Sequence, residues 1–99
     1  MNKAEKKAKE LVERFLGNNQ KPIKPNNKAS SDEKYDYHFD LSLWETTFFP
    51  EAKQGALICV DRSIKMLNEL QQSEHSDAFW VIEVYIQEEK QVKQAINKM

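Results

Sequence analysis

The sequence predicts a mostly α-helical protein of three helices, and three observations carry this prediction. The 99 residues include only two Gly and three Pro, so residues that favour tight turns between strands are scarce. Lys, Glu, Gln, Ala and Leu, which are good helix formers, are abundant. Apolar residues recur at helical spacing in three stretches, at about 3–16, 50–71 and 77–98. A chain of this length supports one modest core, so we expect a single domain over residues 1–99.

The first helix is amphipathic and ends at a glycine. Its apolar residues, from Ala4 to Leu16, form one narrow stripe that needs another element to pack against. Gly17 and the two Asn that follow it are typical of a helix C-terminus. Residues 17–34 then hold two prolines and a single large aliphatic side chain, Ile23, which predicts a flexible loop or linker within the domain.

The segment after this loop has the alternation of a half-buried strand. Apolar side chains occupy every odd position from Tyr35 to Leu43. No convincing second strand lies elsewhere in the chain, and a lone strand needs a partner. We therefore expect a short extended segment at 35–43, with a loop or a helix as the alternatives left open.

The predicted central helix has Pro50 in its first turn and a wide apolar sector, as expected of a helix between two others. Ile58 lies nearly opposite that sector and predicts a second contact surface. Gly55 costs about 1 kcal/mol of helix propensity relative to Ala, which predicts the close approach of another backbone. Cys59, at the margin of the sector, is expected to be a packed thiol rather than a nucleophile.

The last helix carries a heptad-like apolar seam. Alternating steps of four and three residues connect Ala78 to Met99, and only Glu89 interrupts the apolar series. Such a seam predicts contact with a second copy of the chain, and the segment 35–44 is the alternative dimer contact. The seam residues that we expect in a homodimer are Ile82, Tyr85, Val92 and Ile96.

Charge is distributed unevenly along the chain. Residues 1–30 hold eight Lys or Arg against three Glu, a net charge of +5, so that residues 31–99 carry −6 of the total of −1. Clustered cations attract phosphate, so a nucleic-acid-binding accessory role is the alternative function. The residues that would serve it are Lys3, Lys6, Lys7, Lys9, Arg14, Lys21, Lys24 and Lys28.

Signatures of catalysis or of a cofactor are not found. The sequence has no phosphate-binding glycine loop, no His-Glu-x-x-His and no nucleophile elbow. Asp36, His38 and Asp40 would share one face of a strand, but without a fourth ligand we expect a solvated polar edge rather than a metal site. A single cysteine and the lack of a signal-peptide pattern or long apolar run indicate an intracellular, reducing compartment. We expect no enzyme activity, no cofactor and no membrane association.

Three blocks of the sequence resemble a family of small proteins common in phage and prophage genomes. The blocks are KAKELVERF (7–15), AKQGALICVD (52–61) and KQVKQAINKM (90–99). Gly55 stands where that family usually has Cys, so any role of that thiol is absent here. The resemblance brings no activity for any residue. It implies a small accessory protein, phage-encoded and working in the cytoplasm of a bacterial host cell.

These observations predict a small non-enzymatic interaction protein that binds a host protein and modulates or inhibits it, for example a defence or nucleic-acid-handling factor. Aromatic side chains flanked by Asp are suited to protein interfaces, and an acidic surface can occupy a site meant for nucleic acid. The residues that we expect at the protein interface are Tyr35, Asp36, Tyr37, His38, Asp40, Trp44 and Ile58.

Overall fold

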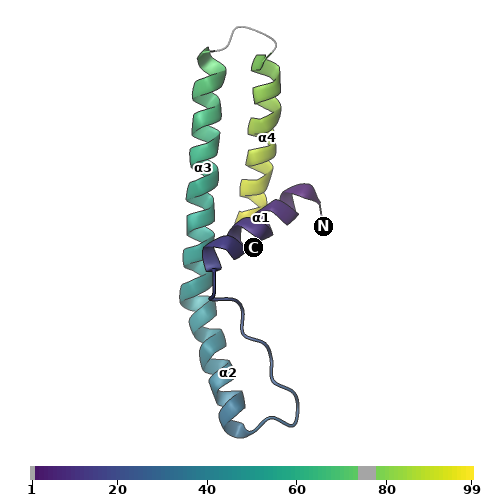
Figure 1. Ribbon diagram of the computed structural model, residues 1–99, viewed down its shortest axis with the longest axis vertical. Coiled ribbons are helices and arrows are strands. Elements are labelled where there is room, and N and C mark those ends of the chain that lie inside the picture. Colours follow the sequence, from purple (N-terminus) through teal and green to yellow (C-terminus); the bar gives the residue numbers. More distant parts are fainter. Residues whose placement is uncertain (1, 74–77) are drawn as a thin grey trace.

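The computed structural model describes residues 2–73 and 78–99, and there the chain is mostly α-helical (Figure 1). The elements are α1 (Lys3–Leu16), α2 (Ser31–Leu43), the π-helix η1 (Trp44–Phe48), α3 (Phe49–Ser73) and α4 (Ala78–Asn97). Because α2, η1 and α3 follow one another without a break, they form one long rod, and the fold consists of three helical rods. The molecule is elongated, with extents of 65 × 23 × 19 Å.

The predicted mostly α, three-helix fold is therefore confirmed. The first helix has the predicted bounds, and the last differs only at its ends; Asp77, where its predicted range began, lies outside the described residues. The central helix extends well beyond its predicted start. None of the described helices is long and apolar enough to cross a membrane.

The core lies where α1 crosses the hairpin formed by α3 and α4 (Figure 1). Small residues line this crossing on both α1 and α3, with Ala8, Ala52 and Ala56 all buried. Small side chains let two helix backbones approach closely, and valine and isoleucine side chains fill the remaining space. The other buried residues of this core are Val12, Leu16, Val60, Val92 and Ile96.

Helix α1 begins and ends where its sequence predicts. The Asn2 side chain caps its N-terminus, since Oδ1 accepts a hydrogen bond from the Glu5 backbone N–H at 2.8 Å. Gly17 ends it with a φ of 56°, a conformation that glycine adopts without the steric cost of a side chain. The prediction of a glycine stop is confirmed.

The extended segment expected at 35–43 does not form, because these residues belong to helix α2, so the helix left open as an alternative is the form observed. Ser30 caps the helix through a 3.2 Å bond from the Glu33 N–H to its Oγ, and Asp32 and Glu33 place negative charge in the first turn. A helix satisfies its own backbone groups, whereas a strand here would have had no neighbour. Residues 31–34, predicted as loop, form the first turn of this helix.

The predicted helix start at Pro50 is also replaced by a continuation of the rod. Proline lacks an N–H and its ring clashes with the carbonyl four residues earlier, which normally breaks a helix. Here the wider π turn of η1 immediately precedes it, and the Phe49 N–H bonds to the Trp44 carbonyl five residues back. The Thr46 hydroxyl donates a further bond of 2.7 Å to the Ser42 carbonyl. The change of register lets the helix pass through the proline.

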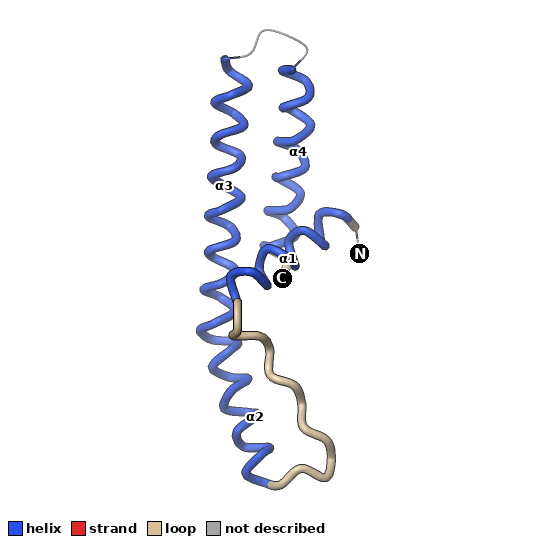
Figure 2. The backbone as a smooth tube through the Cα atoms, in the orientation of Figure 1, coloured by secondary structure: helices blue, strands red, loops and turns tan. Residues whose placement is uncertain are grey.

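A loop of residues 17–30 returns alongside α2 (Figure 2). Local hydrogen bonds shape both its ends. Gln20 Nε2 donates to the Gly17 carbonyl at 2.8 Å, and the Lys28 N–H donates to Asn26 Oδ1 at 2.9 Å. Pro22 and Pro25 lie between these bonds, where no regular element forms.

The apolar seam of α4 packs inside its own chain. Ile82, Val92 and Ile96 are buried against other elements of the same chain, and of the four predicted dimer residues only Tyr85 is largely exposed. The seam faces inward because α3 runs beside α4 and α1 crosses both helices (Figure 1). Three of the four seam residues therefore pack within the chain, and Tyr85 is the one that is exposed.

Candidate protein-binding surface

Helix α2 projects from the three-helix core as an arm (Figures 1 and 2). None of its 13 residues is buried. Isolated helices of this length are marginal in water, since most helix stability in proteins comes from packing an apolar face. The α2 arm, residues Ser31–Leu43, is instead held in line by its continuation through η1 into α3. It presents its side chains to solvent on a pre-formed helix.

An exposed apolar stripe runs along the α2 arm. Tyr35, Phe39 and Leu43 follow one another at intervals of four residues and are 71%, 61% and 39% exposed. On a helix this spacing places them on one face. We call these three residues the arm stripe. The predicted interface did not include Phe39 and Leu43, although their spacing of four residues after Tyr35 was already visible in the sequence.

Acidic side chains border the arm stripe. Asp32, Asp36 and Asp40 also repeat every four residues, and at 100° per residue they lie next to the stripe on one side. Asp36 and Asp40 line an open hollow of about 410 Å³ with Tyr37 and Glu33. Pro22, Ile23 and Pro25 of the loop form its other wall. The arm therefore combines an apolar stripe with a carboxylate-rich flank.

Trp44 has a structural role at the base of the arm. Its Nε1 donates a 2.9 Å hydrogen bond to the Asn19 carbonyl, which ties the loop to the rod. Its ring packs on Phe49 with centroids 4.9 Å apart, and Lys21 Nζ lies 5.8 Å from the ring centroid. A half-buried residue with these partners holds the loop in place and adds little free surface.

The remaining predicted interface residues do not form one surface. Tyr37 contacts His38 with ring centroids 5.3 Å apart, and both belong to the α2 arm. Ile58 is exposed, as predicted, but it lies on α3 beyond η1 and contributes nothing to the arm. The structure therefore brings together Tyr35, Asp36, Tyr37, His38 and Asp40 on one helix and separates Ile58 from them.

The helical form of α2 also separates Asp36, His38 and Asp40, the three residues that a strand would have offered as metal ligands. Residues two apart on a helix point about 160° away from each other, so His38 lies opposite both Asp36 and Asp40. On a strand all three would have shared a face. Among the described residues no group of three potential ligands comes together elsewhere.

The cations that could contact nucleic acid are dispersed. Lys3 and Lys7 line one hollow together with Glu88, and Lys9 lines another with Glu5 and Lys98. Lys21 lies over Trp44, while Lys24 and Lys28 are in the loop and Lys6 is exposed on α1. Carboxylates interleave with these cations, so they form no continuous basic surface among the described residues.

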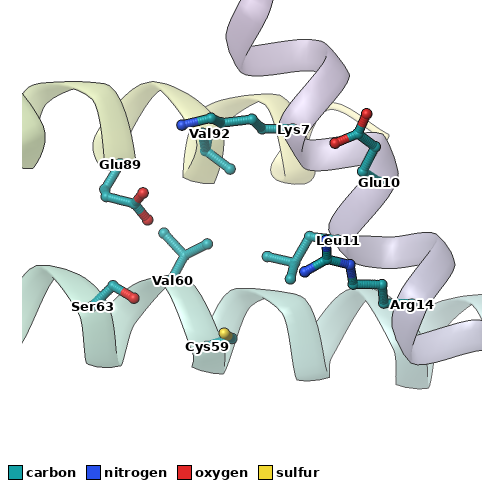
Figure 3. Close-up of a pocket in the computed structure, with 9 residues that line it drawn as sticks. All are labelled: Lys7, Glu10, Leu11, Arg14, Cys59, Val60, Ser63, Glu89 and Val92. Atoms are coloured by element: carbon teal, nitrogen blue, oxygen red, sulfur yellow. The ribbon is translucent and has the colours of Figure 1, made fainter.

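A second hollow, of about 280 Å³, opens between α1, α3 and α4 (Figure 3). Lys7, Glu10 and Arg14 line it from α1, and Glu89 lines it from α4. Cys59 also lines it and is exposed, so the prediction of a packed thiol is wrong; α1 crosses obliquely and leaves this margin of α3 uncovered. Among the described residues, none with an imidazole lines this hollow to activate the thiol. The described lining of this hollow carries charges of both signs and pairs no nucleophile with a base. We therefore interpret it as an ordinary hollow of the protein surface.

Comparisons with protein families, with curated proteins and with solved structures give no significant match to this chain.

Proposed function

We propose that the protein is a non-enzymatic interaction protein whose α2 arm binds another protein. The observation that carries the proposal is the arm stripe, three large apolar side chains on a helix without a single buried residue. An apolar stripe on a projecting helix is the usual ligand for a hydrophobic groove, with anchor residues one turn apart. Exposed apolar surface of this kind also marks interaction sites in soluble proteins.

The charge of the arm defines the partner's groove. Four carboxylates against a single Lys give residues Ser31–Leu43 a net charge of −3, with His38 neutral. A groove with an apolar floor and a basic rim would match both the stripe and its acidic flank. Proteins that handle nucleic acid carry such basic rims.

The biological form that we propose follows from the resemblance of the three sequence blocks. In this form the protein is phage-encoded, acts in the cytoplasm of a bacterial host and inhibits a host factor. The acidic arm would occupy a basic site on that factor and exclude its nucleic acid.

The test is a pull-down from the native host with wild-type protein and a Tyr35→Ser/Phe39→Ser variant. We expect the variant to lose a stoichiometric partner, with affinity at least about tenfold lower, because large aromatic anchors dominate interface energies. Trp80→Ser is the matched control, since Trp80 is 69% exposed but lies on α4, away from the arm. Helical content from circular dichroism checks that every variant is folded.

The result that contradicts the proposal is a partner that both the variant and the control retain equally. Asp36→Asn/Asp40→Asn gives a second test of the same surface, with slower association and a weaker dependence on salt. Titration with duplex and single-stranded DNA at about 50 mM salt examines the alternative function. Tight, salt-sensitive DNA binding that is lost with residues 1–30 would favour that alternative over the arm.

A further inference from the structure

The loop that joins α1 to α2 lies beside the acidic flank of the α2 arm (Figure 2). Pro22, Ile23 and Pro25 form the loop side of the open hollow of about 410 Å³. The arm side of this hollow is lined by Glu33, Asp36, Tyr37 and Asp40. At 100° per residue these four lie on one face of the helix, next to the arm stripe. The loop therefore stands in front of the flank and leaves the stripe open.

The loop and the arm carry opposite charges of equal size. Residues 17–30 hold Lys21, Lys24 and Lys28 and no carboxylate, a net charge of +3, whereas Ser31–Leu43 carries −3. Among the described residues the ion pair formed is Lys93 with Asp61, so no ion pair fixes the loop to the arm. The two segments therefore attract each other across the hollow, over a range that salt limits to about 8 Å at physiological ionic strength.

The loop is tied to the rod at its ends and not between them. The Trp44 indole holds Asn19 at one end, and the other end runs into the N-terminus of α2. Residues 21–28, all of which the structure describes, make no hydrogen bond to Ser31–Leu43, and Ile23 is 91% exposed. A segment with so few contacts opens at low cost in free energy. We call residues 21–28 the strap.

We propose that the strap regulates the α2 arm by competing with a basic partner for the carboxylates of Asp36 and Asp40. The inference rests on the proposed function, since only a partner of the arm has to displace the strap. A groove that takes both the arm stripe and its acidic flank needs the side on which the strap lies. The apparent affinity of the arm is then its intrinsic affinity reduced by the fraction of molecules in which the strap is open.

The lysines of the strap take the place of the partner's basic rim. A weakly basic protein cannot displace them, whereas a groove that offers several cations and an apolar floor gains more from the arm than the strap does. The strap therefore raises the selectivity of the arm at some cost in affinity.

The competition can be measured with the peptide octalysine as the basic probe, by calorimetry at about 50 mM salt, where such contacts are strong. The strap variant is Lys24→Gln/Lys28→Gln. Its matched control is Lys3→Gln/Lys9→Gln on α1, which removes the same charge from exposed positions away from the arm. We expect the strap variant to bind octalysine at least about threefold more tightly than the control, the factor that a strap closed about two-thirds of the time imposes.

Trp44→Phe separates displacement of the strap from a local effect of charge. It removes the bond to Asn19 and changes no charge, so the strap spends less time at the flank and octalysine should bind more tightly than to the wild type. A spin label at Ile23→Cys, in a Cys59→Ser background, reports the position of the strap. It should broaden the amide signals of α2 in nuclear magnetic resonance spectra, and octalysine should restore them.

Equal affinity of the two lysine variants for octalysine overturns the proposal. A Trp44→Phe variant that binds octalysine as the wild type does also overturns it, as do α2 signals that the label leaves sharp. Circular dichroism confirms that each variant keeps its helical content. None of these measurements uses a host partner, so a host partner that Tyr35→Ser/Phe39→Ser retains would contradict the proposed function and leave the competition between strap and probe intact.

Discussion

The ring of Phe15 occupies the space that a side chain at Gly55 would need. A Cβ atom added to Gly55 would lie 2.6 Å from Cδ1 and 2.9 Å from Cε1 of Phe15. The close approach predicted at Gly55 is therefore made by a side chain of α1 and not by a backbone. Phe15 is half exposed, so one side of its ring rests on α3 while the other meets solvent.

Gly55→Ala should lower the free energy of unfolding by about 1 kcal/mol, although alanine is the better helix former. Displacing the Phe15 ring costs about 1–3 kcal/mol, which outweighs the gain in helix propensity of about 1 kcal/mol. In a Phe15→Ala background the clash is absent, and the same substitution should raise stability by about 0.5–1 kcal/mol. Urea denaturation of the four proteins in a double-mutant cycle measures the difference.

If Gly55→Ala changed the free energy of unfolding equally in the wild-type and Phe15→Ala backgrounds, the Phe15 ring would move aside at no cost. Helix propensity alone would then determine the effect of the substitution. Phe15→Ala itself changes packing, so it is the coupling between the two sites, and not either single value, that carries the conclusion.

Elements that depend on local signals were predictable from the sequence. The bounds of α1 follow from its apolar stripe and from Gly17, which supplies the positive φ that ends the helix. The apolar sector of α3 and the seam of α4 were likewise readable from spacing. The three-helix fold needs little more than these patterns, because each helix is stabilised by one buried stripe.

The candidate site was harder to predict, because the apolar residues in 35–43 fit in part both the period of a strand and the period of a helix. Their strict alternation favoured a strand, but the absence of any second strand left that strand without hydrogen-bond partners. One decisive feature was the Ser30 cap, a local signal that the alternating pattern outweighed. The other was the helical continuation through η1 past Pro50, which no local rule predicts. A tertiary contact, Trp44 with Asn19, then fixed the loop beside the arm.

Trp44→Phe should loosen the loop while leaving the helices in place. The substitution removes the donor to the Asn19 carbonyl but keeps an aromatic ring against Phe49, so we expect a loss of about 0.5–1.5 kcal/mol. Hydrogen exchange and proteolysis within residues 17–30 should become faster, and far-ultraviolet circular dichroism should change little. Unchanged protection of the loop would show that this bond does not hold it.

Glu83 should contribute to a loss of stability in acid. Hydrogen bonds donated by Gln71 Nε2 at 2.7 Å and Gln87 Nε2 at 2.9 Å hold the pKa of its carboxyl below the ordinary value. A lowered pKa in the folded state gives stability that is present above the unfolded-state value and is lost as the pH falls through the folded-state value. The loss from this group should therefore occur below the ordinary Glu range, about pH 4.3.

Titration by nuclear magnetic resonance measures this pKa directly. Gln71→Leu should raise it toward the ordinary value, because the strongest donor is removed. In unfolding experiments Glu83→Gln should lose less stability than the wild type between neutral pH and about pH 3, and Glu69→Gln, an exposed control on α3, should follow the wild type. A Glu83 pKa that Gln71→Leu leaves unchanged would contradict the assignment of its cause.

Ala56→Leu should destabilise the fold more than any surface change on the same helix. Ala56 is fully buried where α1 crosses α3, and three added carbons would have to push the two helices apart or force strained rotamers. Overpacking of this kind typically costs about 1–3 kcal/mol, and the contact of α1 with α3 offers little room to relax. Urea unfolding measures the loss, with Gln54→Leu as the exposed control two residues away, expected within about 0.5 kcal/mol of the wild type. Equal stability of the two variants would mean that α1 does not pack tightly on α3, and the close crossing of small residues would then not be what holds the third helix in place.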